Sequence, residues 1–351
     1  MADCCFTDNP AKVLDETVET LNPDRVLVVT DFNVERMVLP SLSDSQILNE
    51  APSIAIPGGE IGKNLESVSE IWKKLEEIGA TRRSLIINIG GGVVTDLGGF
   101  AAGTFKRGIR TINFPTTLLG AVDAATGGKT GINFIGLKNE IGVFHLPSKV
   151  IVSVLPFATL HEKEILSGYA EMIKTAIIND RDFYISLSDL EQVVEDNTQL
   201  ESAVKKCVLI KEEIVAEDPK ESGVRKILNF GHTTGHAFES FCIEKGEEIT
   251  HGKAVAHGML VALILSHMLL GFDSGELYHY LQFLKKYYGG PLIKCEEKEI
   301  VIHKMNNDKK NQVYGEPRFT LLRDIGNPEI NCCPSQSQIK EALEIYNDMM
   351  E

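Results

Sequence analysis

Basic residues are scarce in this sequence of 351 residues. It has 35 lysines and arginines against 50 aspartates and glutamates, which gives a formal net charge of −15 at pH 7. The acidic residues are spread along the chain, and no basic patch that would attract a nucleic acid is visible. A nucleic-acid partner is therefore excluded, and basic residues that bind phosphate would have to act locally.

An export signal and a disulfide framework are also missing. The first residues, MADCCFTDNP, lack the basic-then-apolar pattern of a signal peptide. The seven cysteines are an odd number, and their spacing fits neither a disulfide framework nor a zinc ribbon. We therefore expect a cytoplasmic protein. The uncharged run 254–272 is long enough to cross a bilayer, but it contains His257 and His267, so we expect a buried helix and no membrane association.

Apolar patterns predict two domains of different architecture. In the first half, apolar runs at 25–34, 53–56, 84–89 and 111–114 predict buried parallel strands, and 64–79 and 93–102 predict helices between them. After about residue 156, helical patterns follow at 163–178, 190–216, 233–241, 254–270, 275–288 and 338–350. The expected fold class is α/β: a Rossmann-like doubly wound domain, residues 1–158, followed by a mostly α-helical domain, residues 159–351.

The segment LIINIGGGVVTDLGGF is the strongest local indication of a nucleotide. Backbone amides at a glycine-rich strand-to-helix turn hold a pyrophosphate at the positive end of the helix. The spacing of glycines 90–92 and Asp96 departs from GxGxxG, so a turn that is only packed tightly is the alternative. Asp31, and Glu60 with Lys63, follow other strand ends, where such sheets bind ligands, but capped loops would explain them equally.

The segment TGGKTGIN is no Walker A loop, because the pattern would require a glycine where Asp123 stands. An ATPase is therefore excluded. The segment is too rich in glycine to be a core element, so Lys129, followed by Lys138 and Asn139, is expected either to contact a ligand or to lie in solvent.

Four residues are candidates for a metal site: Glu171, His232, His236 and His251. Imidazole and carboxylate groups without thiolate suit a catalytic Zn²⁺ or Co²⁺. Buried histidines without a metal are the alternative, and the spacing leaves open whether His232 and His236 both bind metal or one acts as an acid or base. Charged and amide residues nearby suit a phosphorylated, polyhydroxylated ligand, although surface ion pairs would also explain them: Lys211, Glu221, Arg225, Asn229, Lys309 and Lys310.

Taken together, several segments resemble the 3-dehydroquinate synthase family: GGGVVTDLGGF, FKRG, FPTTLLG, VDAATGGKTGIN, LKNEIG, GYAEMIK, LNFGHTTGHAFE and THGKAVAHGM. They occur in the family's order and spacing from about residue 31 to 310. The resemblance implies an enzyme of the shikimate pathway of aromatic amino acid biosynthesis that turns 3-deoxy-D-arabino-heptulosonate 7-phosphate into 3-dehydroquinate and phosphate. NAD and Zn²⁺ or Co²⁺ are its implied cofactors, and NAD takes up and returns a hydride without net change.

The resemblance also implies roles for individual residues. Metal binding falls to Glu171, His232 and His251, and His236 handles protons. NAD contacts fall to Asp31, Glu60, Lys63, Gly91, Gly92, Val93, Asp96, Thr116, Thr117, Asp123, Lys138, Asn139 and Thr159, with Asp123 beside the nicotinamide and ribose. Substrate contacts fall to Lys129, Asn139, Lys174, Lys211, Arg225, Asn229, His236, Lys309 or Lys310, and Arg107 across the interface of a homodimer. Catalytic roles fall to His236, Glu221, Lys129, Lys174, Arg225 and Asn229.

Three residues depart from the family's pattern. Thr95 and Gly98 stand where glycine and alanine are expected, and Thr126 replaces a usual valine. Other functions are a sibling cyclase of the 2-deoxy-scyllo-inosose or 2-epi-5-epi-valiolone synthase type, a metal-dependent polyol dehydrogenase, and a non-catalytic NAD- or metal-binding regulator. Asn139, His236 and the DKK segment favour the dehydroquinate reaction.

Overall fold

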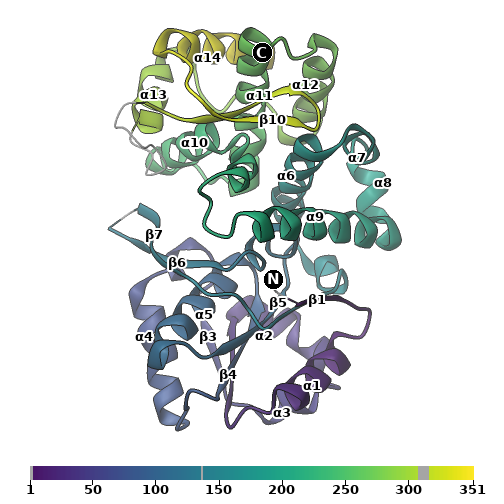
Figure 1. Ribbon diagram of the computed structural model, residues 1–351, viewed down its shortest axis with the longest axis vertical. Helices are drawn as coiled ribbons and strands as arrows, with labels where there is room; N and C mark the ends of the chain where they lie inside the picture. Colours follow the sequence, from purple (N-terminus) through teal and green to yellow (C-terminus); the bar gives the residue numbers. More distant parts are fainter. Residues whose placement is uncertain (1–2, 136, 307–315) are drawn as a thin grey trace. The chain divides into compact units, whose positions relative to one another are not determined.

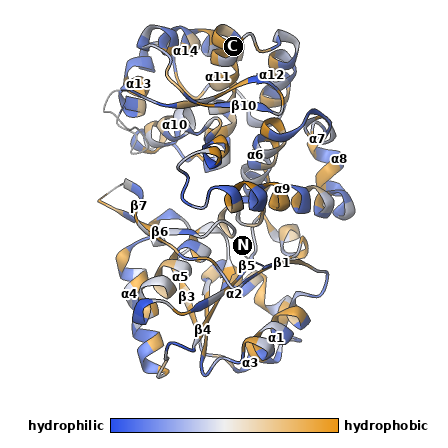
Figure 2. Cartoon of the chain, viewed as in Figure 1, coloured by the Kyte–Doolittle hydropathy of each residue, from blue (hydrophilic) through white to orange (hydrophobic). Residues whose placement is uncertain are grey.

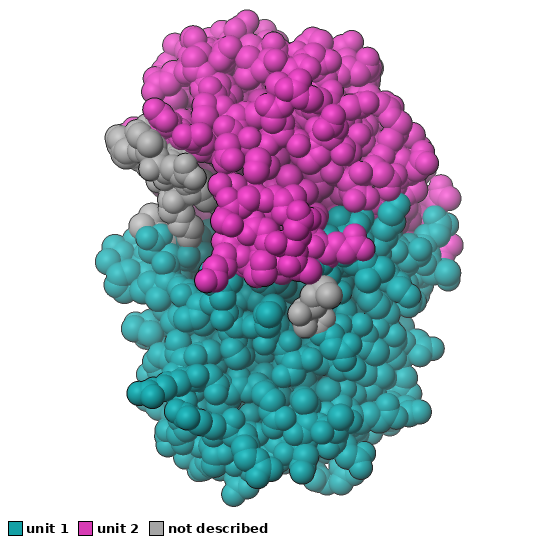
Figure 3. Space-filling view, viewed as in Figure 1, with its two compact units in different colours: residues 1–161, 197–212 teal, residues 162–196, 213–351 magenta. Residues whose placement is uncertain are grey.

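The computed structural model describes residues 3–135, 137–306 and 316–351 (Figure 1). The chain forms two compact units, which Figure 3 shows in different colours. Unit 1 comprises Met1–His161 and Asn197–Glu212, and unit 2 comprises Glu162–Asp196 and Glu213–Glu351. The domain boundary after residue 158 stays a prediction, and residues 197–212 belong to the first compact unit although they follow it in sequence.

Unit 1 is built on a six-stranded parallel sheet in the order β1-β8-β5-β4-β2-β3. The strands are β1 Asp3–Phe6, β2 Val26–Asp31, β3 Ser53–Ile56, β4 Leu85–Gly90, β5 Arg110–Pro115 and β8 Lys149–Val152. The chain winds outward from β2 to β3 and then returns to β4 on the other side of β2. Ligands bind at the carboxyl ends of strands where the winding reverses. The predicted doubly wound α/β architecture is confirmed.

Helices cover both faces of this sheet, because successive strand residues point to opposite sides. Leu27 and Val29 of β2 pack with apolar residues of α4 and α5, whereas Val28 packs with those of α1. Figure 2 shows apolar and polar residues on α1 and α4, as expected of helices that cover a sheet. The helices are α1 Pro10–Leu21, α2 Phe32–Met37, α3 Gln46–Glu50, α4 Leu65–Glu77 and α5 Gly92–Thr104.

The glycine-rich segment after Asp123 forms an antiparallel hairpin, which corrects the expectation of a loop outside the core. Strand β6, Lys129–Phe134, pairs with β7, Leu137–Phe144. Gly131 faces Gly142, and a Cβ on Gly131 would lie 2.7 Å from the carbonyl oxygen of Ile141. The glycines that suggested a wrapping loop therefore allow two strands to approach closely.

Unit 2 is mostly α-helical, as predicted. Its helices are α6 Glu162–Asn179, α7 Arg181–Ser186, α8 Leu190–Glu195, α10 His232–Glu244, α11 His251–Leu270, α12 Ser274–Tyr288, α13 Lys298–Asn306 and α14 Gln336–Met350. Helix α9, Asn197–Glu217, begins in unit 1 and ends in unit 2. The prediction of one helix over 190–216 is wrong, because Asp196 has extended backbone and separates α8 from α9. An antiparallel pair, β9 Phe319–Asp324 and β10 Asn327–Cys332, was not predicted.

Helix α11 is long and apolar enough to cross a membrane by length and composition, and 72% of its most apolar window is buried in protein. Its polar residues make buried hydrogen bonds. Ser266 Oγ accepts one from the backbone N–H of Leu322 at 2.9 Å, and His257 Nδ1 lies 2.9 Å from the Tyr346 hydroxyl. Burial lowers the pKa of His257 to about 3, so its ring is neutral. This is the buried core helix that the sequence predicted.

Candidate functional site

Three helices of unit 2 bring one carboxylate and three imidazoles together. Glu171 lies within α6, His232 begins α10 and His251 begins α11. Oε1 of Glu171 lies 3.5 Å from Nε2 of His232 and 3.7 Å from Nε2 of His251. Ring nitrogens of His232, His236 and His251 lie within 4.8 Å of one another. A tetrahedral ion with bonds of about 2.0–2.1 Å needs donor atoms about 3.3 Å apart, so this spacing suits a metal.

Hydrogen bonds fix the tautomers of two of these imidazoles. Nδ1 of His232 donates to the carbonyl oxygen of Phe230 at 3.2 Å, and Nδ1 of His251 donates to Oε2 of Glu239 at 3.3 Å. Because both partners are acceptors, the proton of each ring lies on Nδ1. In the neutral form of each ring, Nε2 is then the nitrogen with a free lone pair, and it faces Glu171, as metal-binding histidines require.

The carboxylate of Glu171 lies deep in unit 2. Its side chain is 1% exposed, and it forms an ion pair with Lys174, which lies one turn further along α6 and is 2% exposed. Within the described residues, Oε1 accepts no hydrogen bond. A buried carboxylate oxygen without a donor is costly, and a cation between it and two imidazoles would remove that cost. The donor set therefore fits a divalent metal ion, as the sequence suggested.

A tight turn precedes α10 and is organised by Asp218, a residue that the sequence did not single out. One carboxylate oxygen of Asp218 accepts hydrogen bonds from the backbone N–H groups of Gly223 at 2.6 Å and Arg225 at 3.2 Å. The other accepts from Ser222 at 3.0 Å. The bond from Gly223 and its companions lower the pKa of Asp218 to about 2. This charge fixes the backbone that carries Arg225.

Glu221, which lies in this turn, forms a hydrogen bond with Asn229. The short helix Val224–Asn229 ends at Asn229, whose Nδ2 donates to Oε1 of Glu221 at 2.6 Å. Arg225 is 3% exposed, and its Nη1 donates to the carbonyl oxygen of Pro219 at 2.8 Å. Glu221 and Asn229 also line a polar hollow whose other walls come from the same unit: Lys220, Ser222, Lys226, Thr233, Arg318, Phe319, Thr320 and Asn331.

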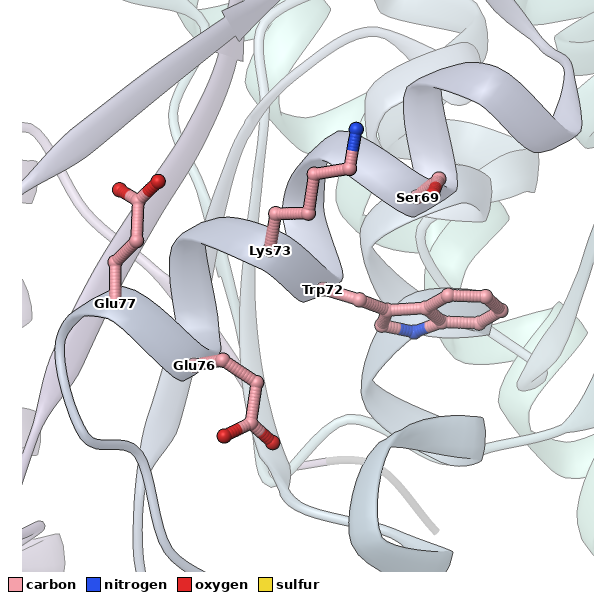
Figure 4. A pocket seen from close by; sticks show the side chains of 5 residues that line it. All are labelled: Ser69, Trp72, Lys73, Glu76 and Glu77. Atoms are coloured by element: carbon pink, nitrogen blue, oxygen red, sulfur yellow. The ribbon is translucent and has the colours of Figure 1, made fainter.

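A second hollow lies in unit 1, far in sequence from these groups. Its lining residues, Ser69, Trp72, Lys73, Glu76 and Glu77, all belong to α4. Figure 4 shows that the two carboxylates point in different directions, and that no group of side chains converges on one point. Trp72 donates to the carbonyl oxygen of Ala101 at 3.1 Å, so it is a packing residue. We assign this hollow no chemistry.

The glycine turn of unit 1 connects β4 to α5. Gly91 is the N-cap of α5, which begins at Gly92, so the first N–H groups of the helix point out of its amino end. A Cβ on Gly92 would lie 3.0 Å from the Cβ of Ala124, and one on Gly91 would lie 3.0 Å from Thr117. Glycine is therefore needed here for close packing, and the N–H groups at the start of α5 also suit a pyrophosphate. Val93 follows in the first turn, and Thr116 is buried at the end of β5.

Lysine 63 joins two residues of the predicted cofactor set. Its side chain is buried, and Nζ donates to Oδ2 of Asp96 and to Oδ1 of Asn139, both at 2.5 Å. Burial raises the pKa of the Asp96 carboxyl, and the positive charge of Lys63 opposes this shift. Asn139 has a left-handed backbone with a φ of 51°, which Asn tolerates better than most residues.

Asn133, which sequence reasoning missed, connects the same groups. Its Nδ2 donates to Oε2 of Glu60 at 2.8 Å, and its Oδ1 accepts from the backbone N–H of Asn139 at 2.9 Å. Nζ of Lys138 lies 3.7 Å from Oε1 of Glu60. The predicted residues Glu60, Lys63, Asp96, Lys138 and Asn139 therefore form one polar cluster.

Other predicted residues of unit 1 have structural partners. Asp31 caps α2, and its Oδ1 accepts from the backbone N–H groups of Asn33 and Val34 at 2.9 and 3.0 Å. Thr159 donates to the carbonyl oxygen of Pro156 at 2.8 Å. The cap occupies one oxygen of Asp31, so the capped-loop interpretation and a cofactor contact are compatible.

The carboxylate of Asp123 forms an ion pair with Lys211 of α9. Nζ of Lys211 also donates to the backbone carbonyl of Asp123 at 2.5 Å. A residue predicted to contact NAD and one predicted to contact substrate therefore meet within unit 1. Lys129 opens β6, and Arg107 lies exposed in a turn where its φ is 71°. Lys309 and Lys310 lie outside the described residues.

Comparison with known proteins covers most of the chain. The model of the 3-dehydroquinate synthase N-terminal part matches residues 53–167, and that of the C-terminal part matches residues 168–311. A 3-dehydroquinate synthase of Parabacteroides distasonis is 43% identical over 335 residues, which are 95% of each chain.

Two solved structures share the fold. A 2-deoxy-scyllo-inosose synthase in complex with carbaglucose-6-phosphate, NAD⁺ and Co²⁺ has a TM-score of 0.84 and covers 98% of this chain and 96% of its own. A 2-epi-5-epi-valiolone synthase of Streptomyces hygroscopicus with NAD⁺ and Zn²⁺ has a TM-score of 0.85 and covers 99% and 97%. Each is 23% identical to this chain, a likeness that establishes the fold.

Proposed function

The chain belongs to the 3-dehydroquinate synthase family, and from that membership we propose that it converts 3-deoxy-D-arabino-heptulosonate 7-phosphate into 3-dehydroquinate and phosphate. The observation that carries this proposal is the meeting of Glu171, His232 and His251, which come from three helices. A carboxylate and two oriented imidazoles form a catalytic type of metal site, with a position left for substrate. The enzyme acts as a phosphate-eliminating lyase.

NAD and a divalent metal ion, Zn²⁺ or Co²⁺, are the proposed cofactors; when bound, they supply a hydride acceptor and a Lewis acid for a substrate oxygen. The metal is held by Glu171, His232 and His251. Glu239 keeps the His251 ring in its ligating tautomer through the bond to Nδ1. NAD is held at the carboxyl edge of the sheet by the glycine turn and by the cluster around Lys63.

Cations and amides of the chain bind and orient the substrate. Lys174 and Arg225 are buried, so the charges they direct at phosphate or carboxylate act in a weakly screened environment. Lys129, Asn139, Lys211 and Asn229 complete the proposed contacts, together with Lys309 or Lys310. The bound phosphate serves as its own base during elimination, and His236 and Glu221 move the remaining protons.

The chain is further proposed to act as a cytoplasmic homodimer in which Arg107 contacts the substrate of the partner subunit. The FKRG segment turns through Lys106 and Arg107, which have φ values of 48° and 71°. Such values are rare for residues with side chains and are found more often at functional sites than elsewhere. Lys106 Nζ anchors the turn by donating to the carbonyl oxygen of Ala80 at 2.5 Å.

A coupled assay tests the reaction itself. The full-length protein with 3-deoxy-D-arabino-heptulosonate 7-phosphate, NAD⁺ and Zn²⁺ or Co²⁺ is expected to release phosphate and 3-dehydroquinate in equal amounts without net NADH, because the hydride is returned. Phosphate is measured colorimetrically, dehydroquinate by chromatography and NADH by absorbance. Steady NADH accumulation, above all with glycerol or short alcohols, would favour a polyol dehydrogenase and refute the cyclase reaction.

His236 is expected to be needed for turnover and dispensable for the metal. Its ring lies 5.3 Å from that of His232 and 5.8 Å from that of His251, close enough to serve as either ligand or proton carrier. His236→Asn should lower kcat at least about 100-fold, as loss of a general acid or base does, and should retain one Zn²⁺ per chain by elemental analysis. If the variant loses the metal, His236 is a metal ligand. His161→Ala, at an exposed position, is the control.

A further inference from the structure

Two buried asparagines form a polar chain inside the sheet of unit 1. Asn88 of β4 and Asn113 of β5 are register partners and are 0% and 6% exposed. Nδ2 of Asn88 donates to Oδ1 of Asn113 at 2.8 Å, and Nδ2 of Asn113 donates to the carbonyl oxygen of Ala125 at 3.0 Å. A carbonyl only accepts hydrogen bonds, so Ala125 fixes the orientation of the Asn113 amide, and Asn113 in turn fixes that of Asn88.

Gly98 of α5 leaves space for the side chain of Asn88. A Cβ at Gly98 would lie 1.7 Å from Oδ1 of Asn88, so an alanine there would force the Asn88 amide out of its position and away from its hydrogen bond to Asn113. Gly98 is one of the residues that depart from the expected family pattern, in which the resemblance predicts alanine at this position. The structure explains this departure, because Asn88 occupies the space of the missing methyl group. The Asn88 amide in this position therefore requires glycine at position 98.

The series of hydrogen bonds through Asn88 and Asn113 ends beside a π-helical turn, Gly120–Ala124, that contains Asp123. Such turns are uncommon and are frequently found at functional sites. Gly120 N–H donates to Oγ1 of Thr117 at 3.0 Å at the start of the turn, and Asn113 holds the Ala125 carbonyl just beyond its end. Thr126, a second departure from the family's pattern, donates to the Asp123 carbonyl at 3.3 Å.

The held turn packs on the glycine turn that opens α5. The Cβ of Ala124 would meet any Cβ on Gly92 at 3.0 Å, so a shift of the π-helical turn moves the surface against which the glycine turn rests. Lys211 restrains the Asp123 side of the turn. The Asn113 amide is the side-chain donor to its far end.

From this geometry we infer that Asn113, oriented by Asn88, is a positioning residue that sets the place of Asp123 and Ala124 in the NAD site. Neither asparagine reaches the surface of the sheet, so each acts through the π-helical turn. The inference rests on the proposed function and on the contact with the nicotinamide and ribose that the family resemblance implies for Asp123. It predicts that NAD⁺ affinity depends on two amides buried in the core.

Asn113→Ala and Thr111→Val form the matched pair that tests this dependence in the full-length protein. Thr111 lies two residues earlier on β5, is 1% exposed, and its hydroxyl makes no hydrogen bond among the described residues. Asn113→Ala should raise the Kd and KM for NAD⁺ about tenfold, as loss of one to two hydrogen-bond equivalents does, with the KM for substrate within about twofold. Thr111→Val should leave the Kd for NAD⁺ unchanged. A merely structural role would lower Tm without raising the Kd.

A compensated double variant separates positioning from packing. Gly98→Ala alone should be strongly destabilised, whereas Asn88→Ala with Gly98→Ala places a methyl group where the Asn88 amide was and should fold with a Tm near that of the wild type. It should still bind NAD⁺ about three- to tenfold more weakly by calorimetry, because the Asn113 amide has lost its partner. If this variant and Asn113→Ala both bind NAD⁺ as tightly as the wild type does, the inference is wrong, and the proposed function is unaffected. No NAD⁺ binding by the wild type would overturn the proposed function with it.

Discussion

Replacing Glu171 with glutamine is expected to abolish tight binding of Zn²⁺ and to lower kcat/KM at least about 1,000-fold, the equivalent of about 4 kcal/mol. Glutamine has the same shape, but it lacks the charge that offsets the cation and keeps two imidazoles ligating. Oε1 of Glu171 lies 3.5 and 3.7 Å from the two Nε2 atoms, so the amide would remain in place with a weaker donor oxygen. Bound zinc is measured by elemental analysis, and affinity by competition with a chelator.

Two carboxylates serve as controls for this substitution. Glu239→Gln removes the negative charge of the acceptor of His251 Nδ1 but no ligand, so it should weaken metal binding only about 10- to 100-fold. Glu162→Gln, at the exposed start of α6, should change neither metal binding nor turnover. A Glu171→Gln variant that holds zinc as tightly as the wild type would show that the ion is not bound here.

The same change also tests the buried ion pair with Lys174. Both side chains are almost fully buried, and breaking such a pair typically costs about 3–5 kcal/mol because one charge is left without compensation. Circular dichroism must therefore accompany the metal measurement. If the variant is folded and has lost zinc, the loss is due to the missing carboxylate ligand and not to unfolding.

Residues at strand ends and in helix repeats could be predicted from the sequence, because each depends on local pattern. The glycines after β4 and the pair His232 and His236 are visible as spacing alone. That His251 and Glu171 approach the same point depends on how α6, α10 and α11 pack, and no spacing encodes this. Here the resemblance to a family supplied what local reasoning left open.

Supporting residues were missed for a related reason. Asp218, Asn133 and Glu239 look like ordinary polar residues in sequence, and their roles arise from backbone N–H groups and imidazoles brought to them by folding. Asn88 lies within an otherwise apolar strand, where an amide is costly unless it is paired. An amide in an apolar strand could therefore have been read as a sign of a buried hydrogen bond. The unexpected glycine at position 98 was a sign of the space that this amide occupies.

Errors in the fold came from short elements. The strand Phe319–Asp324 has only four consecutive buried residues, and helix and strand periodicities differ little over such a length. The end of α8 depends on the backbone of Asp196, which no apolar repeat reveals. The long elements α6, α11 and α14 were found, because several turns of periodicity outweigh local exceptions.

Substituting alanine for Gly258 is expected to lower Tm by about 4–8 °C and to remove the metal site with it. A Cβ there would lie 2.1 Å from the carbonyl oxygen of Gly231 and 2.6 Å from the backbone N of Gly235. Backbone atoms of α10 cannot turn aside as a side chain does, so α10 and α11 must separate. Overpacking typically costs about 1–3 kcal/mol, and a clash with backbone atoms is expected at the upper end of that range. After the gain of about 1 kcal/mol from replacing a helical glycine, the net loss is about 2 kcal/mol.

The separation of α10 from α11 has a specific consequence, because these helices begin at His232 and His251. Zinc should raise the Tm of the wild type through binding to the folded state, and should not raise that of Gly258→Ala. Gly290→Ala is the matched control: no atom lies within 4 Å of its added Cβ, so its Tm and zinc response should match the wild type. Scanning fluorimetry with and without zinc measures both. A Gly258→Ala variant that melts at the wild-type temperature would show that the helix contact tolerates a methyl group, and that close approach of the two helices does not build the site.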